Sequence, residues 1–390
     1  MLAPPLALIR AAAIAPVVAF LRGAGAPVER LLGLSHLPPQ ILHTPESLIP
    51  LRQAVRFIEG SARETGIENL GSLAASHASI TMLGMFGHLV RRGATLARAL
   101  ETAIRAMPAF NSGLCYLLTM EESRAEVRPE FMDAYAEGSR QVHEYFHTLM
   151  LGLVRLVRRQ GERVEVRSTT SNGLPVVVFP PAMLERPLGP IFPARAIDEG
   201  AVQAWLASTP AGDFAGAVEQ VIHTLSSPTA PRIGLTAAAI GISVRGLQRR
   251  LAEAGMSYER LVVQSRFATA TQLLQNTDVT VLDVALDAGY SDHAHFTRAF
   301  RRWTGMSPSE FRRTRRGTVR AANDDRLCRD RAVALTRVES SDQPARVVTL
   351  VKSSLSASSV GVASPRVTIS CSPARALSRP ASTARKQPRL

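Results

Sequence analysis

Cysteine is scarce in this sequence of 390 residues, which contains only Cys115, Cys328 and Cys371. The three lie far apart and form no Cys-x-x-Cys pair. This spacing argues against a disulfide framework and against an all-cysteine metal site. We therefore expect a reducing compartment, the cytoplasm, and we expect Cys115 to be a small buried hydrophobe.

Long uncharged apolar runs are also rare. The N-terminal 23 residues are apolar, but Arg10, Arg22 and several prolines interrupt them. Residues 69–90 carry no formal charge, yet they contain serines, a threonine, an asparagine and two histidines. Such polar side chains are costly in lipid. We expect a buried helix pair broken at glycine, and no contact with a membrane.

Aromatic residues are absent after Phe311. The segment 318–390 is rich in Ser, Ala, Arg, Val and Pro. A segment of this composition cannot bury much apolar surface. We therefore predict that 318–390 is a disordered basic tail.

Positive charge is abundant but unevenly placed within the net charge of +14. Residues 1–230 hold 20 Arg and 20 acidic residues, whereas 231–317 hold 13 Arg and 7 acidic residues. The tail holds 13 Lys and Arg against 5 acidic residues. A basic excess confined to the C-terminal part favours a polyanionic partner.

The pentapeptide HEYFH at 143–147 places His143 and His147 four residues apart around Glu144. On a helix this spacing resembles the motif of zinc metalloproteases. A catalytic zinc also needs a third protein ligand, but the next histidine is His223. A zinc metallohydrolase therefore remains an alternative without a complete ligand set, and we predict no metal.

Periodicity predicts a mixed α+β domain over 41–225, after a helical lead-in at 1–40. Apolar residues at helical spacing indicate a helix at 45–66, with Thr44 as its cap and Pro45 in its first turn. Alternation and apolar runs predict further elements: helices at 95–107 and 133–158, strands at 114–120, 125–131, 162–169 and 174–180, and two short helices within 195–230. The segment 226–231, SSPTAP, has the composition of a linker.

Two similar heptapeptides, AAAIGIS at 237–243 and ALDAGYS at 285–291, lie 48 residues apart. Both have the order small residue, glycine, serine that a helix-turn-helix requires. The small residue allows close helix contact, the glycine adopts a left-handed backbone, and the serine caps the second helix. We assign these turn positions to Ala237, Gly241 and Ser243 in the first copy, and to Ala285, Gly289 and Ser291, or Asp292 as the cap, in the second.

Capping signals support the boundaries of the second copy. Thr280 with Asp283 and Ser307 with Glu310 have the spacing of capping boxes. A helix predicted at 258–276 joins the two copies. An all-α double helix-turn-helix at 232–317 accounts for these signals better than a helical bundle with coincidental turns.

Residues 241–313 resemble the AraC/XylS-type DNA-binding domain, most specifically in FTRAFRRWTGMSPSEFR at 296–312. Upstream segments such as VERLLGL at 28–34 and LARALETAIR at 96–105 resemble the effector domain of the subgroup named for arabinose binding. The resemblance implies a transcriptional regulator with two helix-turn-helix units and an N-terminal effector domain. Proteins that join such a domain to an alkyl-transferring cysteine domain need a four-cysteine cluster that is missing here.

Helical spacing separates the inner and outer faces of the two second helices. Leu247, Leu251, Phe296 and Phe300 are expected to face the core. The outer positions match those that contact DNA in the family, so we expect DNA contacts from Arg245, Gln248, Arg249, His293, Ala294, Thr297 and Arg298.

The implied partners are double-stranded DNA, RNA polymerase, a small-molecule effector and a second copy of the chain. No cofactor and no catalytic residue is expected. One alternative stays open: the N-terminal domain serves only to dimerise or to contact a partner protein. The identity of the effector does not follow from the sequence.

Overall fold

The structure is a computed structural model that describes residues 6–131, 139–157, 165–168, 175–189, 197–226, 231–314 and 367–370. The chain divides into two compact parts. The N-terminal part holds the described residues up to 226, together with 231–265 and 367–370. The C-terminal part holds 266–314. The division therefore lies inside helix α12 (Tyr258–Asn276).

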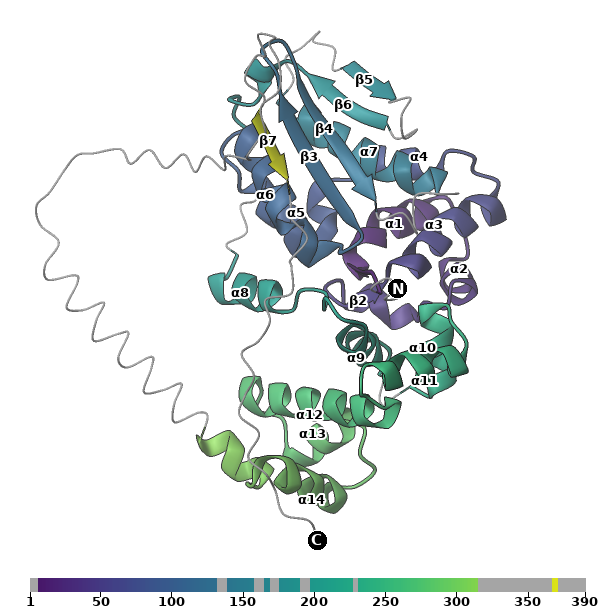
Figure 1. The fold of residues 1–390 in the computed structure, drawn as a ribbon, viewed down its shortest axis with the longest axis vertical. Coiled ribbons are helices and arrows are strands. Elements are labelled where there is room, and N and C mark those ends of the chain that lie inside the picture. Colours follow the sequence, from purple (N-terminus) through teal and green to yellow (C-terminus); the bar gives the residue numbers. More distant parts are fainter. Residues whose placement is uncertain are drawn as a thin grey trace, which may run out of the picture. The chain divides into compact units, whose positions relative to one another are not determined.

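A five-stranded antiparallel sheet forms one layer of the N-terminal part, in the order β5-β6-β4-β3-β7 (Figure 1). Its strands are β3 (Leu114–Met120), β4 (Ala125–Phe131), β5 (Glu165–Ser168), β6 (Pro175–Phe179) and β7 (Val367–Ser370). The strands predicted at 114–120 and 125–131 have these bounds and pair as neighbours, with Leu117 opposite Arg128. Alternate residues of β3, such as Tyr116 and Leu118, are buried.

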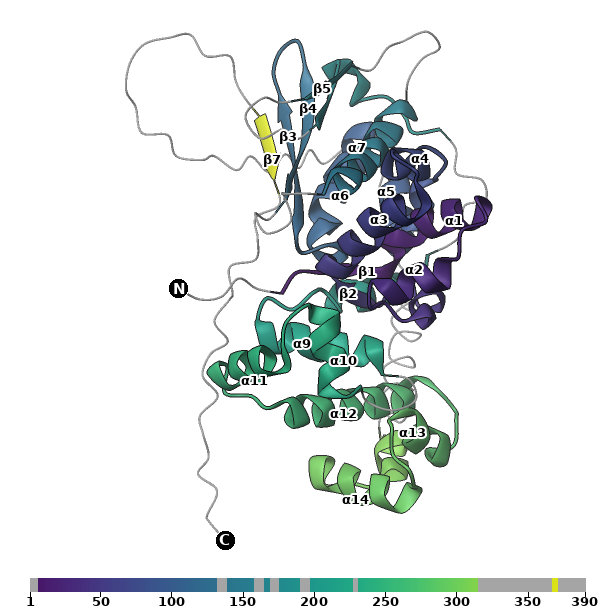
Figure 2. The same cartoon turned by 90° about the vertical axis from the view of Figure 1, so that its right-hand side faces the viewer.

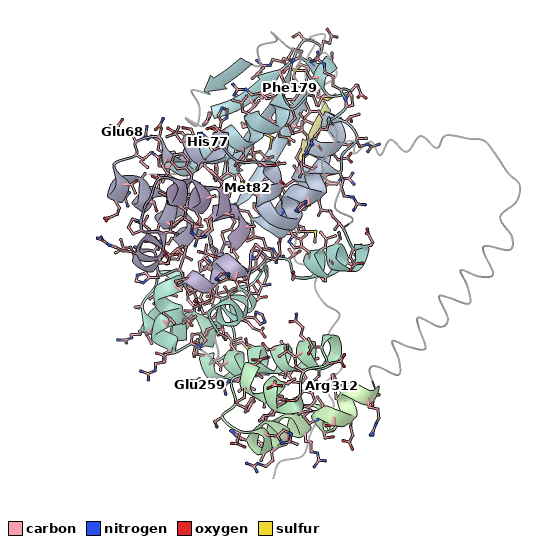
Figure 3. The ribbon with its side chains drawn as sticks, turned by 180° about the vertical axis from the view of Figure 1, so that it is seen from behind. Glu68, His77, Met82, Phe179, Glu259 and Arg312 are labelled. Atoms are coloured by element: carbon pink, nitrogen blue, oxygen red, sulfur yellow. The ribbon has the colours of Figure 1, made fainter. Side chains whose placement is uncertain are left out.

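Helices gather on one face of this sheet (Figure 2). They are α3 (Leu51–Thr65), α4 (Leu70–Ser76), α5 (Gly84–Arg91), α6 (Leu96–Phe110) and α7 (Arg140–Arg155). Their apolar faces share one hydrophobic core with the sheet. Phe179, at the end of β6, belongs to this core and is 2% exposed (Figure 3).

The uncharged segment 69–90 forms α4, a 3-10 turn at Ile80–Leu83, and α5. These elements meet at a bend of 108°. Among the described residues no single helix has the length and apolar composition to cross a membrane, although this bent pair passes a test of length and composition.

The N-terminal residues differ from the predicted helical lead-in. Helices α1 (Ala15–Gly23) and α2 (Val28–Leu34) are present, but β1 (Leu8–Arg10) pairs with β2 (Leu48–Pro50). The helix predicted to begin at Pro45 therefore begins at Leu51 instead. Strands of three residues are too short to give a detectable alternation, which is why the sequence prediction missed them.

Arg10 ties this N-terminal segment to distant elements. Its side chain is buried, and its guanidinium donates hydrogen bonds to the carbonyls of Ala109 at 3.0 Å and Ser208 at 2.7 Å. It also lies over the Trp205 ring, 5.2 Å from the centroid. Burial lowers the pKa of Arg10. Backbone carbonyls thus satisfy the guanidinium, and the negative charge of Glu46 also favours its protonated form.

The segment predicted to be a disordered tail contains one described strand, and Cys115 differs from its predicted state. Residues 367–370, which fall in the segment expected to be disordered, form β7 and pair with β3, with Ser370 opposite Leu117. The remainder of the tail lies outside the described residues, apart from this strand. Cys115 is disulfide-bonded and half-buried, so the expectation of a small buried hydrophobe in a chain without disulfides was wrong. The wide separation of the cysteines in the sequence concealed this bond.

The helices after residue 197 complete the described chain. The N-terminal part contains α8 (Glu199–Ala207), α9 (Phe214–Leu225), α10 (Ile233–Ile240) and α11 (Val244–Glu253). The C-terminal part contains α13 (Val281–Asp287), α14 (His293–Thr304) and a last helix from residue 308, which carries Arg312 (Figure 3). The fold class is confirmed: an α+β domain precedes an all-α region.

Candidate DNA-contacting site

The first helix-turn-helix unit comprises α10 and α11. Gly241 ends α10 with φ +80°, in the left-handed region that favours glycine. The backbone N–H of Ile242 donates to the carbonyl of Ala237 at 3.0 Å, which closes the end of the helix. Ser243 then caps α11 by accepting from the N–H of Gly246 at 3.1 Å.

The second helix-turn-helix unit comprises α13 and α14 and repeats this geometry. Gly289 has φ +78°, and the N–H of Tyr290 donates to the carbonyl of Ala285 at 2.9 Å. The cap of α14 is Asp292, whose carboxylate accepts from the N–H of His295 at 2.6 Å. The assignment of the cap to Ser291 was therefore wrong, and the alternative is correct. The His295 hydrogen bond lowers the pKa of Asp292.

Each second helix has one buried and one exposed face. Leu247, Leu251, Phe296 and Phe300 are fully buried. Of the residues expected to contact DNA, six are exposed: Arg245, Gln248, Arg249, His293, Ala294 and Arg298. Thr297 differs, because it is half-buried and its hydroxyl oxygen is enclosed.

The exposed arginines are weakly held. Arg249 lies 3.7 Å from Glu253, and both side chains are more than half exposed, so water screens this pair. Arg245 and Arg298 form no ion pair within the described part of the chain. Arg250 differs, because its guanidinium stacks on Phe214 of α9, 3.8 Å from the ring centroid. Three guanidinium groups thus remain available to an anionic partner.

The HEYFH segment lies on α7, and its side chains make packing, ion-pair and hydrogen-bond contacts within the domain. Glu144 pairs with Arg140 at 3.4 Å, and the His143 ring packs 4.7 Å from that of Phe131. The His147 ring bonds the carbonyl of Pro175, while burial lowers its pKa. No group of three His, Cys, Asp or Glu residues in the described ranges could hold a metal ion. The structure gives the metallohydrolase alternative no support.

Comparison with known families gives two matches along the chain. Residues 236–314 match the model of a helix-turn-helix domain. Residues 25–169 match the model of the arabinose-binding domain of AraC transcription regulators, N-terminal. The first match covers both helix-turn-helix units, and the second covers helices α2 to α7 and the β3–β4 hairpin.

Curated relatives match over most of their length. An ornithine utilization regulator from Pseudomonas aeruginosa is 24% identical over 307 residues, which is 73% of this chain and 90% of that protein. The transcriptional regulator VirS from Mycobacterium tuberculosis is 24% identical over 330 residues, which is 78% of this chain and 96% of that protein. A solved structure, the transcriptional regulator CdpR from Pseudomonas aeruginosa, aligns at 17% identity and a TM-score of 0.30 over 74% of this chain and 96% of that chain.

The two family models follow each other in the order in which AraC-type regulators carry these domains, and the relatives that match across both domains are regulators too. The duplicated turn geometry and the exposed basic helices agree with a DNA-binding region of this family. The chain belongs to the AraC-type family of DNA-binding transcription regulators with an arabinose-binding-type N-terminal domain.

Proposed function

We propose that α11 and α14 each enter a major groove of one DNA duplex and contact base edges there. An α-helix fits the major groove, and successive grooves on one side of B-DNA recur about every 34 Å. The observation that carries the proposal is the duplication itself. Both helices follow the same closed turn and present exposed polar faces with arginine, while apolar residues fix the opposite face.

The exposed side chains suit distinct contacts. Arg245, Arg249 and Arg298 can donate two hydrogen bonds to guanine, and Gln248 can pair with adenine. His293 lies in the first turn of α14, next to Ala294. A small side chain at Ala294 lets the helix approach the bases closely. Mapping of bound sites across the genome tests this proposal, and an absence of any enriched sequence motif would contradict it.

We further propose that the N-terminal domain takes a small, largely apolar effector. A cavity between α5, α6, β3 and α7 is lined by apolar side chains and one hydroxyl, that of Tyr116. Tyr116 is buried, and burial raises the pKa of its phenol, so the hydroxyl keeps its proton as a hydrogen-bond donor. A sugar would leave several hydroxyls unpaired in this cavity, each at a cost of about 1–3 kcal/mol. A ligand with one acceptor for Tyr116 fits better.

The free space in this cavity is about 20 Å³, which is room for one water molecule. Entry of an effector must therefore displace side chains. Met107 and Met150 line the cavity, and methionine repacks readily. A thermal-shift screen of the full chain with small apolar carbonyl compounds and with sugars tests the class. If no compound of either set raised the unfolding temperature, the alternative that the domain only dimerises or contacts another protein would be favoured.

A second copy of the chain and RNA polymerase are further proposed partners. Membership of a family of transcription regulators supports both. Sedimentation of the chain with and without operator DNA tests the first, and pull-down of purified RNA polymerase with operator-bound chain tests the second.

A further inference from the structure

The first helix-turn-helix unit shares its packing with the N-terminal domain. Gln53, on α3, is fully buried, and its amide nitrogen donates to the carbonyls of Ala238 at 3.0 Å and Ala239 at 2.7 Å. These carbonyls belong to the last turn of α10, where regular intrahelical donors run out. Ala238 also accepts from the N–H of Gly241 at 3.1 Å. A side chain 185 residues away in the sequence thus caps the first helix of the unit.

A neighbouring side chain extends this contact. Arg52 brings its guanidinium to 3.5 Å from the carbonyl of Gly241. A Cβ atom added to Gly241 would lie 3.3 Å from the Arg52 side chain. A cation at the C-terminal end of α10 is also favoured by the helix dipole. The turn of the first unit therefore rests directly on the start of α3.

Apolar packing joins the same elements. One hydrophobic core combines Leu6, Leu8 and Leu48 of the N-terminal segment with residues of α9, α10, α11 and the start of α12. Thr224 of α9 also donates its hydroxyl hydrogen to the carbonyl of Leu48 at 2.8 Å. On α11, Arg250 stacks on Phe214 of α9. Contacts of three kinds thus converge on the first unit.

The second unit has a separate core. Ala270 and Leu274 of α12 pack with Phe296, Phe300 and other residues of α13, α14 and the last helix. This core contains no residue from before Ala270 among its buried members in the described chain. The compact parts accordingly divide between Ser265 and Arg266, inside α12.

We infer that the surface formed by Arg52, Gln53, Leu48 and α9 is a docking surface whose partner is the first helix-turn-helix unit, so that the N-terminal domain acts on DNA through α11 alone. This inference rests on the proposed DNA contacts of α11 and α14. It adds that the N-terminal domain controls the DNA contact of α11 but not that of α14. A change in the N-terminal domain moves or loosens the first unit and leaves the second unit unaffected.

Hydrogen exchange on the full chain tests the docking without DNA. Gln53→Met keeps the length of the side chain but removes its amide donor from both carbonyls, of which Ala238 retains the N–H of Gly241. Gln40→Met, at an exposed glutamine, is the matched control. We expect amides in 233–261 to exchange about tenfold faster in Gln53→Met, which corresponds to about 1.4 kcal/mol. Amides in 281–311 should not change. An equal increase in both segments, or none in either, would overturn the inference.

The unmodified chain supplies a second measurement if Gln53→Met does not fold. Under mild denaturant, amides of α10 and α11 should open together with those of α3 and α9. If α10 and α11 instead open together with α13 and α14, at a common and lower free energy, the two units form one domain independent of α3 and the docking surface is refuted.

DNA binding then tests whether the N-terminal domain acts on DNA through α11. On operator duplexes selected from a random pool, Gln53→Met should bind several-fold more weakly than the unmodified chain. The ratio of the two affinities should approach one when the bases contacted by α11 are scrambled. A ratio that persists on the scrambled duplex overturns the assignment to α11. Absence of binding by the unmodified chain would refute the proposed function instead, while the exchange measurement would still decide the docking.

Discussion

The N–H of Ile242 donates to the carbonyl of Ala237 at 3.0 Å, closing a turn around Gly241 at φ +80°. The same bond recurs 48 residues later, from Tyr290 to Ala285 at 2.9 Å around Gly289. Because this bond spans five residues, it requires a left-handed residue at the fourth position after the alanine. The spacing of alanine and glycine in the sequence is thus a direct consequence of the turn.

Gly241→Ala should destabilise the protein by at least about 1 kcal/mol, because alanine is strained at positive φ and Arg52 must move aside. Gly234 is the control, since it lies on α10 with open space around it. Gly234→Ala should instead stabilise slightly, by about 0.5–1 kcal/mol. Urea unfolding measures both changes. Equal effects of the two substitutions would refute the conformational account of the turn.

Asp292→Ala should lower the unfolding midpoint of the second unit, because the N–H of His295 loses its acceptor. Ser291→Ala should have little effect, since Ser291 does not cap α14. Thermal unfolding of the two variants side by side, followed by tryptophan fluorescence, measures the difference. If Ser291→Ala proved the more damaging of the two, the cap assignment made from the structure would be incorrect.

Stability should fall as the pH is lowered below about 6.5, the usual pKa of histidine. Burial lowers the pKa of His147 in the folded chain. Between the folded and unfolded pKa values the unfolded chain binds more protons, so acid favours unfolding, with a slope of at most about 1.4 kcal/mol per pH unit. His147→Gln should reduce this slope in urea unfolding, whereas His43→Gln, at an exposed site, should leave it unchanged.

Much of the fold follows from local sequence signals. The β3 and β4 strands, helix α12 and the capping box of Thr280 with Asp283 lie at the predicted residues. Alternation, helical spacing and caps depend on neighbouring residues, so they are visible in one sequence. The partition of inner and outer faces on α11 and α14 rests on the same periodicity.

Features that depend on distant partners were not predictable. The pairing of β1 with β2, the disulfide of Cys115 and the cap that Gln53 places on α10 join residues far apart in the chain. A buried glutamine amid the apolar positions of α3 is a signal that, in retrospect, indicates a polar partner. The sequence does not identify which partner.

Arg249→Ala and Arg298→Ala should each weaken binding to the specific operator by about 1–3 kcal/mol, because each removes a base contact. Arg98→Ala is the control, an exposed arginine on α6 that is paired with Glu101 at 2.9 Å. It should leave affinity unchanged in fluorescence anisotropy. Loss of affinity with the control and not with the other two would exclude these helices as the contact site.

Hydroxyl-radical footprinting of the chain on its selected operator tests the central claim most directly. We expect two protected patches on one side of the duplex, about one helical turn of 10–10.5 base pairs apart. Arg249→Ala should weaken one patch and Arg298→Ala the other. A single patch, or loss of the same patch in both variants, would contradict the proposal that α11 and α14 contact separate grooves.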